Sequence, residues 1–142
     1  MGSFIHHRTV EFHETDAAGL VHFSNYFRYA ESAEHALYRS IDYSMMKKVD
    51  GAFLGWPRVR AQAKYSAPLD SGDVMRIELW IAELKDKAID WNYKIFKDKD
   101  DTLAAKGSFV TLHVRFDALT RDMLTLPIPE ELRTLLAPFV GD

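Results

Sequence analysis

Hydrophobic and polar residues follow two different periods along this chain. Between Asn25 and about Ile41, apolar side chains recur every three or four positions, which is the spacing of a helix with one buried face. Further apolar residues at Phe27, Ala36 and Tyr38 widen that face. We therefore predict a long helix that other parts of the chain enclose.

From Arg58 onward the period changes to two, which is typical of half-buried strands. Strands are predicted over residues 58–65, 75–81, 89–95 and 103–116, and residues 4–12 are predicted to form a short first strand. The last long strand is expected to place four apolar residues on one face, namely Val110, Leu112, Val114 and Phe116. The intervening turns are too short for parallel crossovers, so about five strands should form an antiparallel sheet.

The remaining segments complete an α+β fold. Asp50-Gly51 and Gly55-Trp56-Pro57 predict loops, and Pro127 and Pro129 precede a final short helix. No linker interrupts the chain, so residues 1–142 are expected to form a single domain. The strand Leu103–Phe116 is long enough to leave a sheet edge, and exposed edges pair readily. We therefore predict a dimer that joins two sheets edge to edge.

Composition narrows the function classes. The apolar fraction of 47% fits a folded protein, yet no apolar run approaches the roughly 20 residues of a membrane span. The absence of cysteine excludes disulfides and a thiolate nucleophile, and with the absence of a signal-peptide core it leads us to expect a cytoplasmic location. A formal net charge of −3 argues against nucleic acid as a partner.

The segment from Glu14 to Tyr26 carries the candidate chemistry. It places a lone carboxylate, Asp16, in a turn between a predicted strand and the start of the predicted helix, with Gly19 inside the turn. A carboxylate beside the positive end of a helix can act as nucleophile or base while helix amides bind an oxyanion. The same position also suits an aspartate that merely caps a turn or a helix, so both interpretations stay open.

Four segments, in this order along the chain, carry a family resemblance: the run from Val10 through Asp16 to Tyr29, residues 63–69 leading into Gly72-Asp73, residues 105–107, and residues 126–129. On these segments the chain resembles the hotdog-fold acyl-CoA thioesterases of the 4-hydroxybenzoyl-CoA thioesterase family. The resemblance implies a long central helix wrapped by an antiparallel sheet, with no metal and no organic cofactor. It also implies acyl-CoA as substrate and a homodimer or homotetramer with its active site at the subunit interface.

The resemblance assigns two catalytic groups. The family's catalytic aspartate falls on Asp16, and its oxyanion-polarising amide falls on the backbone N–H of Phe23, at the start of the helix. Asp16 would attack the thioester carbon and give a mixed anhydride, or it would activate water as a base. Coenzyme A leaves as a thiolate that needs little protonation, so one carboxylate and one amide can suffice.

Further residues are candidates for substrate contacts. Position 22 is often aromatic in the family but is His22 here, where it lines the pocket, hydrogen-bonds a polar acyl group or packs structurally. Gly19, Tyr26 and Trp56 are candidates for the acyl pocket, although a core or interface position suits Trp56 equally well. The predicted substrate is an aromatic or a short- to medium-chain acyl-CoA.

Charged residues outside the turn give weaker indications. Lys85 and Lys87 lie in a predicted hairpin and are candidates for the coenzyme A phosphates, with solvated turn lysines as the alternative. Another hotdog branch uses a helical glutamate, but Glu31 and Glu34 are better explained as a solvated or ion-paired helix face. The histidines show no spacing that suits a metal site.

Two rival functions remain from the sequence. A hotdog enoyl-thioester dehydratase would need a histidine and an acid in a different motif, which this chain does not show. A non-catalytic protein that binds acyl thioesters would keep the pocket without the chemistry. Hydrolysis of an acyl-CoA thioester is the function that the turn around Asp16 favours.

Overall fold

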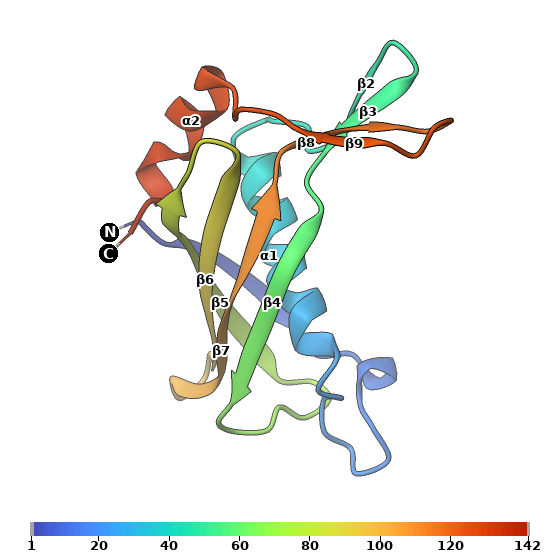
Figure 1. Cartoon of the computed structure of the whole chain (residues 1–142). Coiled ribbons are helices and arrows are strands. Elements are labelled where there is room, and N and C mark those ends of the chain that lie inside the picture. The colour runs from blue at the N-terminus through green and yellow to red at the C-terminus, as the bar shows by residue number, and fades with distance from the viewer. Residues whose placement is uncertain (1, 142) are drawn as a thin grey trace.

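Figure 1 shows the main sheet with one face packed against a helix, in a computed structural model that describes residues 2–141. This sheet has five strands. Every neighbouring pair of strands is antiparallel, as the short turns predicted. In spatial order the strands are β1 (Phe4–Thr9), β5 (Val74–Leu84), β6 (Ala88–Lys97), β7 (Thr102–Leu112) and β4 (Arg58–Tyr65).

Helix α1 (Asn25–Ser40) lies across the inner face of this sheet and contacts β1, β4 and β5. Ala30, Ala33 and Leu37 are buried at helical spacing, as the period predicted, and Tyr29 is fully buried beside them. The expectation of a long central helix wrapped by the sheet is corrected, because α1 has 16 residues and leaves one side uncovered. That side carries exposed charged or titratable residues at helical spacing, namely Arg28, Glu31, His35 and Arg39.

A second, four-stranded sheet was not predicted. It joins β2 (Lys47–Val49), β3 (Ala52–Gly55), β8 (Val114–Asp117) and β9 (Met123–Thr125), and it projects beyond the end of the main sheet (Figure 1). The expected loop at Asp50-Gly51 is the β2–β3 turn, where both residues have positive φ. Strands of three or four residues are too short for an alternating pattern to stand out.

The prediction for residues 103–116 was wrong in two respects. The run is not one strand, because it is interrupted at His113, and its two halves join different sheets. Phe109 and Thr111 are buried in β7, so Val110 and Leu112 point to the outer face. Apolar residues occur on both faces of β7, and a period of two does not say which face is covered.

The free edges of the main sheet are β1 and β4. The predicted edge strand is β7, but it lies between β6 and β4 and pairs on both sides. Strand order depends on contacts between distant segments, which the pattern along the chain does not contain.

The two ends of the chain complete the fold. The first strand ends at Thr9, earlier than predicted, and a short 3-10 helix follows at Phe12–Glu14. The predicted final helix is α2 (Glu130–Leu136), which buries Leu132 and Leu136 completely and continues into a 3-10 turn at Ala137–Phe139. Within residues 2–141, no helix combines the length and apolar character needed to cross a membrane.

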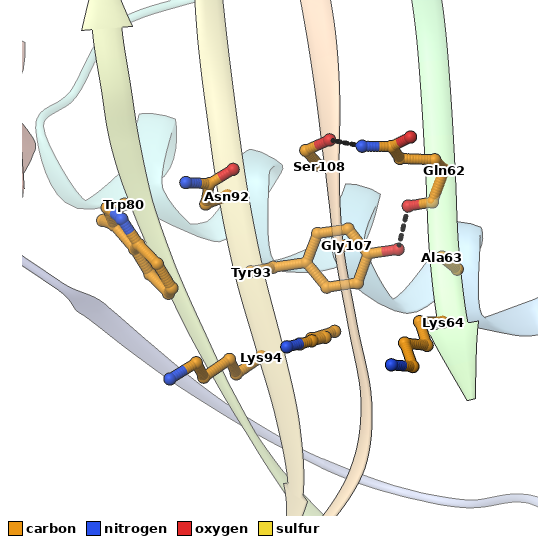
Figure 2. A pocket seen from close by; sticks show the side chains of 10 residues that line it. Gln62, Ala63, Lys64, Trp80, Asn92, Tyr93, Lys94, Gly107 and Ser108 are labelled. Carbon is orange, nitrogen blue, oxygen red and sulfur yellow. Dashed lines mark hydrogen bonds between the residues drawn. The ribbon is translucent and has the colours of Figure 1, made fainter. Parts of the chain in front are cut away.

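A glycine in β7 allows one cross-strand tether. The hydroxyl of Tyr93 on β6 reaches across β7 and donates to the carbonyl of Gln62 on β4, at 3.0 Å (Figure 2). A Cβ on Gly107 would lie 2.1 Å from that carbonyl oxygen and 2.4 Å from the Tyr93 hydroxyl. Burial raises the pKa of Tyr93 to about 12. The missing side chain therefore lets Tyr93 tie β4 to the rest of the sheet.

Candidate active site

Asp16 lies in a tight loop whose two ends are bridged at Thr15 and Val21. Its amide donates to the carbonyl of Leu20 at 2.7 Å, and its carbonyl accepts from Gly19, whose φ of 83° suits a glycine. Asp16 Oδ1 accepts hydrogen bonds from the amides of Ala18 at 2.9 Å and Leu20 at 3.3 Å. The loop thus orients the carboxylate, and Oδ2 has no hydrogen bond within residues 2–141.

The backbone amide of Phe23 stands just before α1. The neighbouring amides are occupied: Asn25 N–H donates to the carbonyl of His22 at 2.9 Å, and Ser24 N–H donates to His22 Nδ1 at 3.3 Å. The Phe23 amide donates to no acceptor in the described part of the chain. An unused N–H at a helix start, where the helix dipole is positive, suits a developing negative charge.

The buried carboxylate of Glu14 holds the loop in place through hydrogen bonds. This carboxylate accepts from the guanidinium of Arg8, from the Glu11 amide at 2.9 Å and from the Tyr29 hydroxyl at 2.9 Å. Burial by itself would raise the pKa of Glu14, but these hydrogen bonds outweigh it and lower the pKa. Glu14 therefore stays ionised and holds β1, the loop and α1 together.

The backbone carbonyl of Glu14 holds the other side of the loop. It accepts from the His22 amide at 3.0 Å and from the Asn25 side-chain amide at 2.8 Å. These two donors flank Phe23, so a single carbonyl fixes the backbone on both sides of the unused amide. The sequence interpretation missed Glu14; the only local signal was its spacing from Glu11, which suits a capping box.

Asp16 and Phe23 line the same surface hollow, of about 370 Å³. Aromatic rings form one wall, where Tyr26 and Tyr65 meet edge to face with centroids 5.0 Å apart. The Tyr65 hydroxyl donates to the Phe23 carbonyl at 3.1 Å, which ties β4 to the start of α1. The complete lining is Asp16, Leu20, Val21, Phe23, Tyr26, Tyr65, Ser66, Ala67 and Pro68.

Of the other predicted residues, His22 and Gly19 lie near this hollow, whereas Trp56 lies far from it. His22 is exposed at the rim, stacked on the Phe23 ring at 4.6 Å, with Nδ1 2.8 Å from Ser24 Oγ. Gly19 is exposed in the loop. Trp56 lies beyond the opposite end of β4, against His113 at 4.6 Å and Tyr38 at 6.3 Å between ring centroids.

Lys85 and Lys87 are also distant from Asp16 within one chain. They lie in the hairpin that follows β5, whereas the Asp16 loop lies near the beginning of that strand, where Leu20 bridges to Asp70. A strand of 11 residues spans roughly 35 Å. Lys85 Nζ lies 3.3 Å from Asp90 Oδ2, in a partly exposed ion pair.

The helical glutamates lie outside the hollow. Glu34 is fully buried and lies 2.8 Å from the Arg58 guanidinium, although the contact is too poorly aligned for a hydrogen bond. Burial raises the pKa of Glu34 to about 7, against the opposing effect of Arg58. Glu31 lies 3.8 Å from the same guanidinium. Both therefore belong to an ion-paired contact between α1 and β4, and residues 2–141 contain no cluster of potential metal ligands.

Known proteins resemble this chain in sequence and in structure. The sequence pattern of the thioesterase-like superfamily matches residues 10–136. A protein of Aquifex aeolicus, named provisionally as an esterase, is 35% identical over 94% of this chain and 97% of its own length. A 1,4-dihydroxy-2-naphthoyl-CoA hydrolase of Prochlorococcus marinus is 32% identical over 84% of this chain and 79% of its own. The solved structure of a gentisyl-coenzyme A thioesterase superimposes with a TM-score of 0.74 at 26% identity, covering 94% of this chain and 99% of that one.

Proposed function

The chain belongs to the thioesterase-like superfamily, and on this basis we propose that it hydrolyses acyl-CoA thioesters at the hollow that Asp16 and Phe23 share. The observation that carries the proposal is the pairing of these two groups. Among residues 2–141, Asp16 presents an oriented carboxylate with one oxygen unoccupied, and Phe23 presents an amide without an acceptor at the start of α1. Both line one surface hollow with an aromatic wall.

The chemistry follows from these two groups. The thioester carbonyl oxygen accepts a hydrogen bond from the Phe23 amide, which stabilises the negative charge that develops there. Asp16 Oδ2 attacks the carbonyl carbon, the C–S bond breaks, and coenzyme A leaves as a thiolate. Water then hydrolyses the mixed anhydride and restores the carboxylate. In the alternative route Asp16 takes a proton from water, and the resulting hydroxide attacks the same carbon.

The lining of the hollow favours an aromatic acyl group. Phe23, Tyr26 and Tyr65 offer ring surfaces, and edge-to-face contacts between rings stabilise beyond simple burial. Two of the relatives act, by their names, on hydroxylated aromatic acyl groups. We therefore propose a hydroxyaromatic acyl-CoA as the preferred substrate, ahead of short- or medium-chain aliphatic ones.

We further propose that two copies pair along β4 and complete the hollow between them. Strand β4 has one free edge, and Tyr65 and Val59 on it are 44% and 56% exposed. Phe23, beside the end of β4, is 62% exposed. Large apolar side chains gathered along an unpaired edge are typical of an interface.

Such a pairing would also explain how Trp56, Lys85 and Lys87 could contribute to the site, although they lie far from Asp16 within one chain. A two-fold axis through β4 makes the two strands antiparallel, so the Arg58 end of one copy meets the Tyr65 end of the other. Trp56 from the second copy would then approach the hollow of the first. Lys85 and Lys87 lie at that same end of the sheet, so their proposed contacts with coenzyme A phosphates would also be made across the interface.

The test is a thioesterase screen over aromatic and aliphatic acyl-CoA substrates, with Asp16→Asn beside the wild type. Loss of a nucleophile or base is expected to lower turnover at least roughly 100-fold. Asp70→Asn is the matched control, because Asp70 is an exposed aspartate close to the loop but outside the lining.

Three results would count against the proposal. Near-full activity of Asp16→Asn would contradict the assigned role. An intact protein that binds acyl-CoA analogues without turning over any thioester would be a binding protein. Hydration of enoyl thioesters with the thioester left intact would indicate a dehydratase.

A further inference from the structure

A second hollow lies on the outer face of the main sheet, opposite α1. It has a volume of about 470 Å³ and is formed by side chains of four neighbouring strands, from β5 to β4 (Figure 2). Its lining differs from that of the Asp16 hollow in having no carboxylate among the described residues. The complete lining is Gln62, Ala63, Lys64, Trp80, Asn92, Tyr93, Lys94, Lys106, Gly107 and Ser108.

Three lysines stand side by side across this hollow. Lys94 on β6 is directly opposite Lys106 on β7, which is directly opposite Lys64 on β4. Directly opposed residues in an antiparallel sheet have Cβ atoms about 5 Å apart, and like charges there are destabilising. The next residue in the row is Glu78, which already lies 3.4 Å from Arg76. The row therefore concentrates positive charge on a chain that is negative overall.

Protection of a sheet edge does not account for this row. Lysines on edge strands often prevent unwanted pairing, and Lys64 on β4 fits that role. Lys94 and Lys106 lie on β6 and β7, which are paired on both sides. Edge protection therefore does not explain two of the three charges, and an anion bound between them would relieve their repulsion.

The hollow also offers neutral donors and a flat ring. A second row of opposed residues runs parallel to the lysines and contains Asn92, Ser108 and Gln62, with Trp80 at its β5 end. Figure 2 shows this row on one side of Tyr93 and Gly107, and Lys94 and Lys64 on the other. Lys94 Nζ lies 6.0 Å from the Trp80 ring centroid, so charge and ring adjoin each other.

We propose that this outer hollow binds a phosphorylated ligand of the adenine-nucleotide type. Lys64, Lys94 and Lys106 would hold the phosphate groups, the amides of Gln62 and Asn92 would donate to remaining oxygens, and the indole of Trp80 would support the planar base. The ligand is either a free nucleotide or the nucleotide end of coenzyme A. The second source rests on the proposed function, and it would replace the phosphate contacts proposed above for Lys85 and Lys87 of a second copy. It is geometrically accessible because Lys64 and Tyr65 are adjacent residues that line the two hollows on opposite faces of β4.

The experiment measures binding of adenosine 3′,5′-bisphosphate and of pyrophosphate to the wild type, Lys106→Gln and Lys99→Gln. Isothermal titration is performed at constant ionic strength adjusted with KCl, because exposed charges are screened by salt. Lys106→Gln removes the central charge of the row and is expected to weaken binding at least about 10-fold. Lys99→Gln makes the same charge change in an exposed turn outside this hollow and should alter affinity less than about twofold.

Thermal unfolding provides a second readout. Without ligand, Lys106→Gln should unfold at the same or a higher temperature than the wild type, because a like-charge contact is removed. The nucleotide should raise the unfolding temperature of the wild type but not of the variant. Should Lys106→Gln fail to fold, Lys94→Gln serves the same purpose. Equal affinity of Lys106→Gln and wild type, or equal weakening by Lys99→Gln, would overturn the proposal.

Kinetics then separate the two sources. If the nucleotide end of coenzyme A occupies the hollow, Lys106→Gln should raise KM for the acyl-CoA substrate and leave kcat unchanged. If a free nucleotide occupies it, KM should stay at the wild-type value while nucleotide binding is lost. The binding measurement itself needs no turnover, so it remains informative even if the protein proves not to be a thioesterase.

Discussion

At the scale of single residues, the backbone carbonyl of Glu14 links the catalytic loop to the helix start. It accepts from His22 and from the side chain of Asn25, on either side of Phe23. Because the direction of the Phe23 amide depends on these bonds, Asn25 is a positioning residue in the proposed reaction. Its side chain would never contact the substrate, yet its loss would misdirect the oxyanion donor.

Replacement of Asn25 by alanine tests this role. One hydrogen bond of about 1 kcal/mol is lost, so we expect kcat to fall roughly fivefold to tenfold while KM changes little. Steady-state kinetics on the best acyl-CoA substrate provide both values. Ser32→Ala is the matched control, since the Ser32 hydroxyl donates to the backbone carbonyl of Tyr29 within the same helix. A change in KM alone would assign Asn25 to substrate binding.

Residues that depend on local sequence were predictable, and those that depend on distant partners were not. Asp16, Gly19 and Phe23 lie within eight positions of one another, so this short segment alone was enough to predict the turn and its candidate residues. Glu14 gains its importance from Arg8 and from Tyr29, one turn into α1 and 15 positions away. Apart from its spacing from Glu11, nothing in the local pattern distinguished Glu14 from a surface glutamate.

At the scale of elements, Gly107 decides how β4 is held. We expect Gly107→Ala to destabilise the protein by about 1–3 kcal/mol, because the new methyl group overlaps the backbone of β4 and the Tyr93 hydroxyl. Urea denaturation gives the change in the free energy of unfolding. Gly55→Ala is the control, because no atom lies within 4 Å of the added carbon, and its effect should stay within about 0.5 kcal/mol.

The buried contact between Glu34 on α1 and Arg58 on β4 makes stability depend on pH. Burial raises the pKa of Glu34 to about 7, from an ordinary value of 4.5. Between these two values the folded state binds a proton that the unfolded state has released, so the free energy of unfolding falls as pH rises through this window. The expected loss is on the order of 3 kcal/mol.

Urea denaturation at pH 5 and pH 7.5 measures this dependence. Glu34→Gln cannot titrate and should show a smaller decrease in stability between the two pH values than the wild type does. An identical pH dependence in both proteins would mean that Glu34 is already ionised at pH 5. The comparison within each protein also removes the constant cost of changing a buried side chain.

Elements with a strong hydrophobic period were predictable, but the spatial order in which these elements pack was not. The period of α1 and of β4 to β7 is long enough to locate each element to within a few residues. The strand order that leaves β4 free, and the break at His113 that sends β8 into a separate sheet, arise from contacts between distant segments. The small sheet was not predicted because its strands have three or four residues each, which is too short for an alternating pattern to stand out.

At the scale of the whole molecule, pairing through β4 determines whether the proposed active site is complete. We expect the protein to sediment as a dimer or a larger oligomer. Ala61→Glu places a charge on an exposed position of β4 in each copy, and the two charges would then repel across the two-fold axis. Dissociation to monomers with parallel loss of turnover is the expected outcome in analytical ultracentrifugation and activity assays. An active monomer would contradict a shared site.

The tether between Tyr93 and Gln62 also gives the protein an optical signal of its own. A tyrosine with a pKa near 12 stays protonated in mildly alkaline solution, where exposed tyrosines begin to form the strongly absorbing tyrosinate. If β4 separated from β7, Tyr93 would lose both its cover and its acceptor and would ionise with the others. Alkaline ultraviolet titration of the wild type against Tyr93→Phe would therefore report whether this edge strand is attached, without a label and without any substrate.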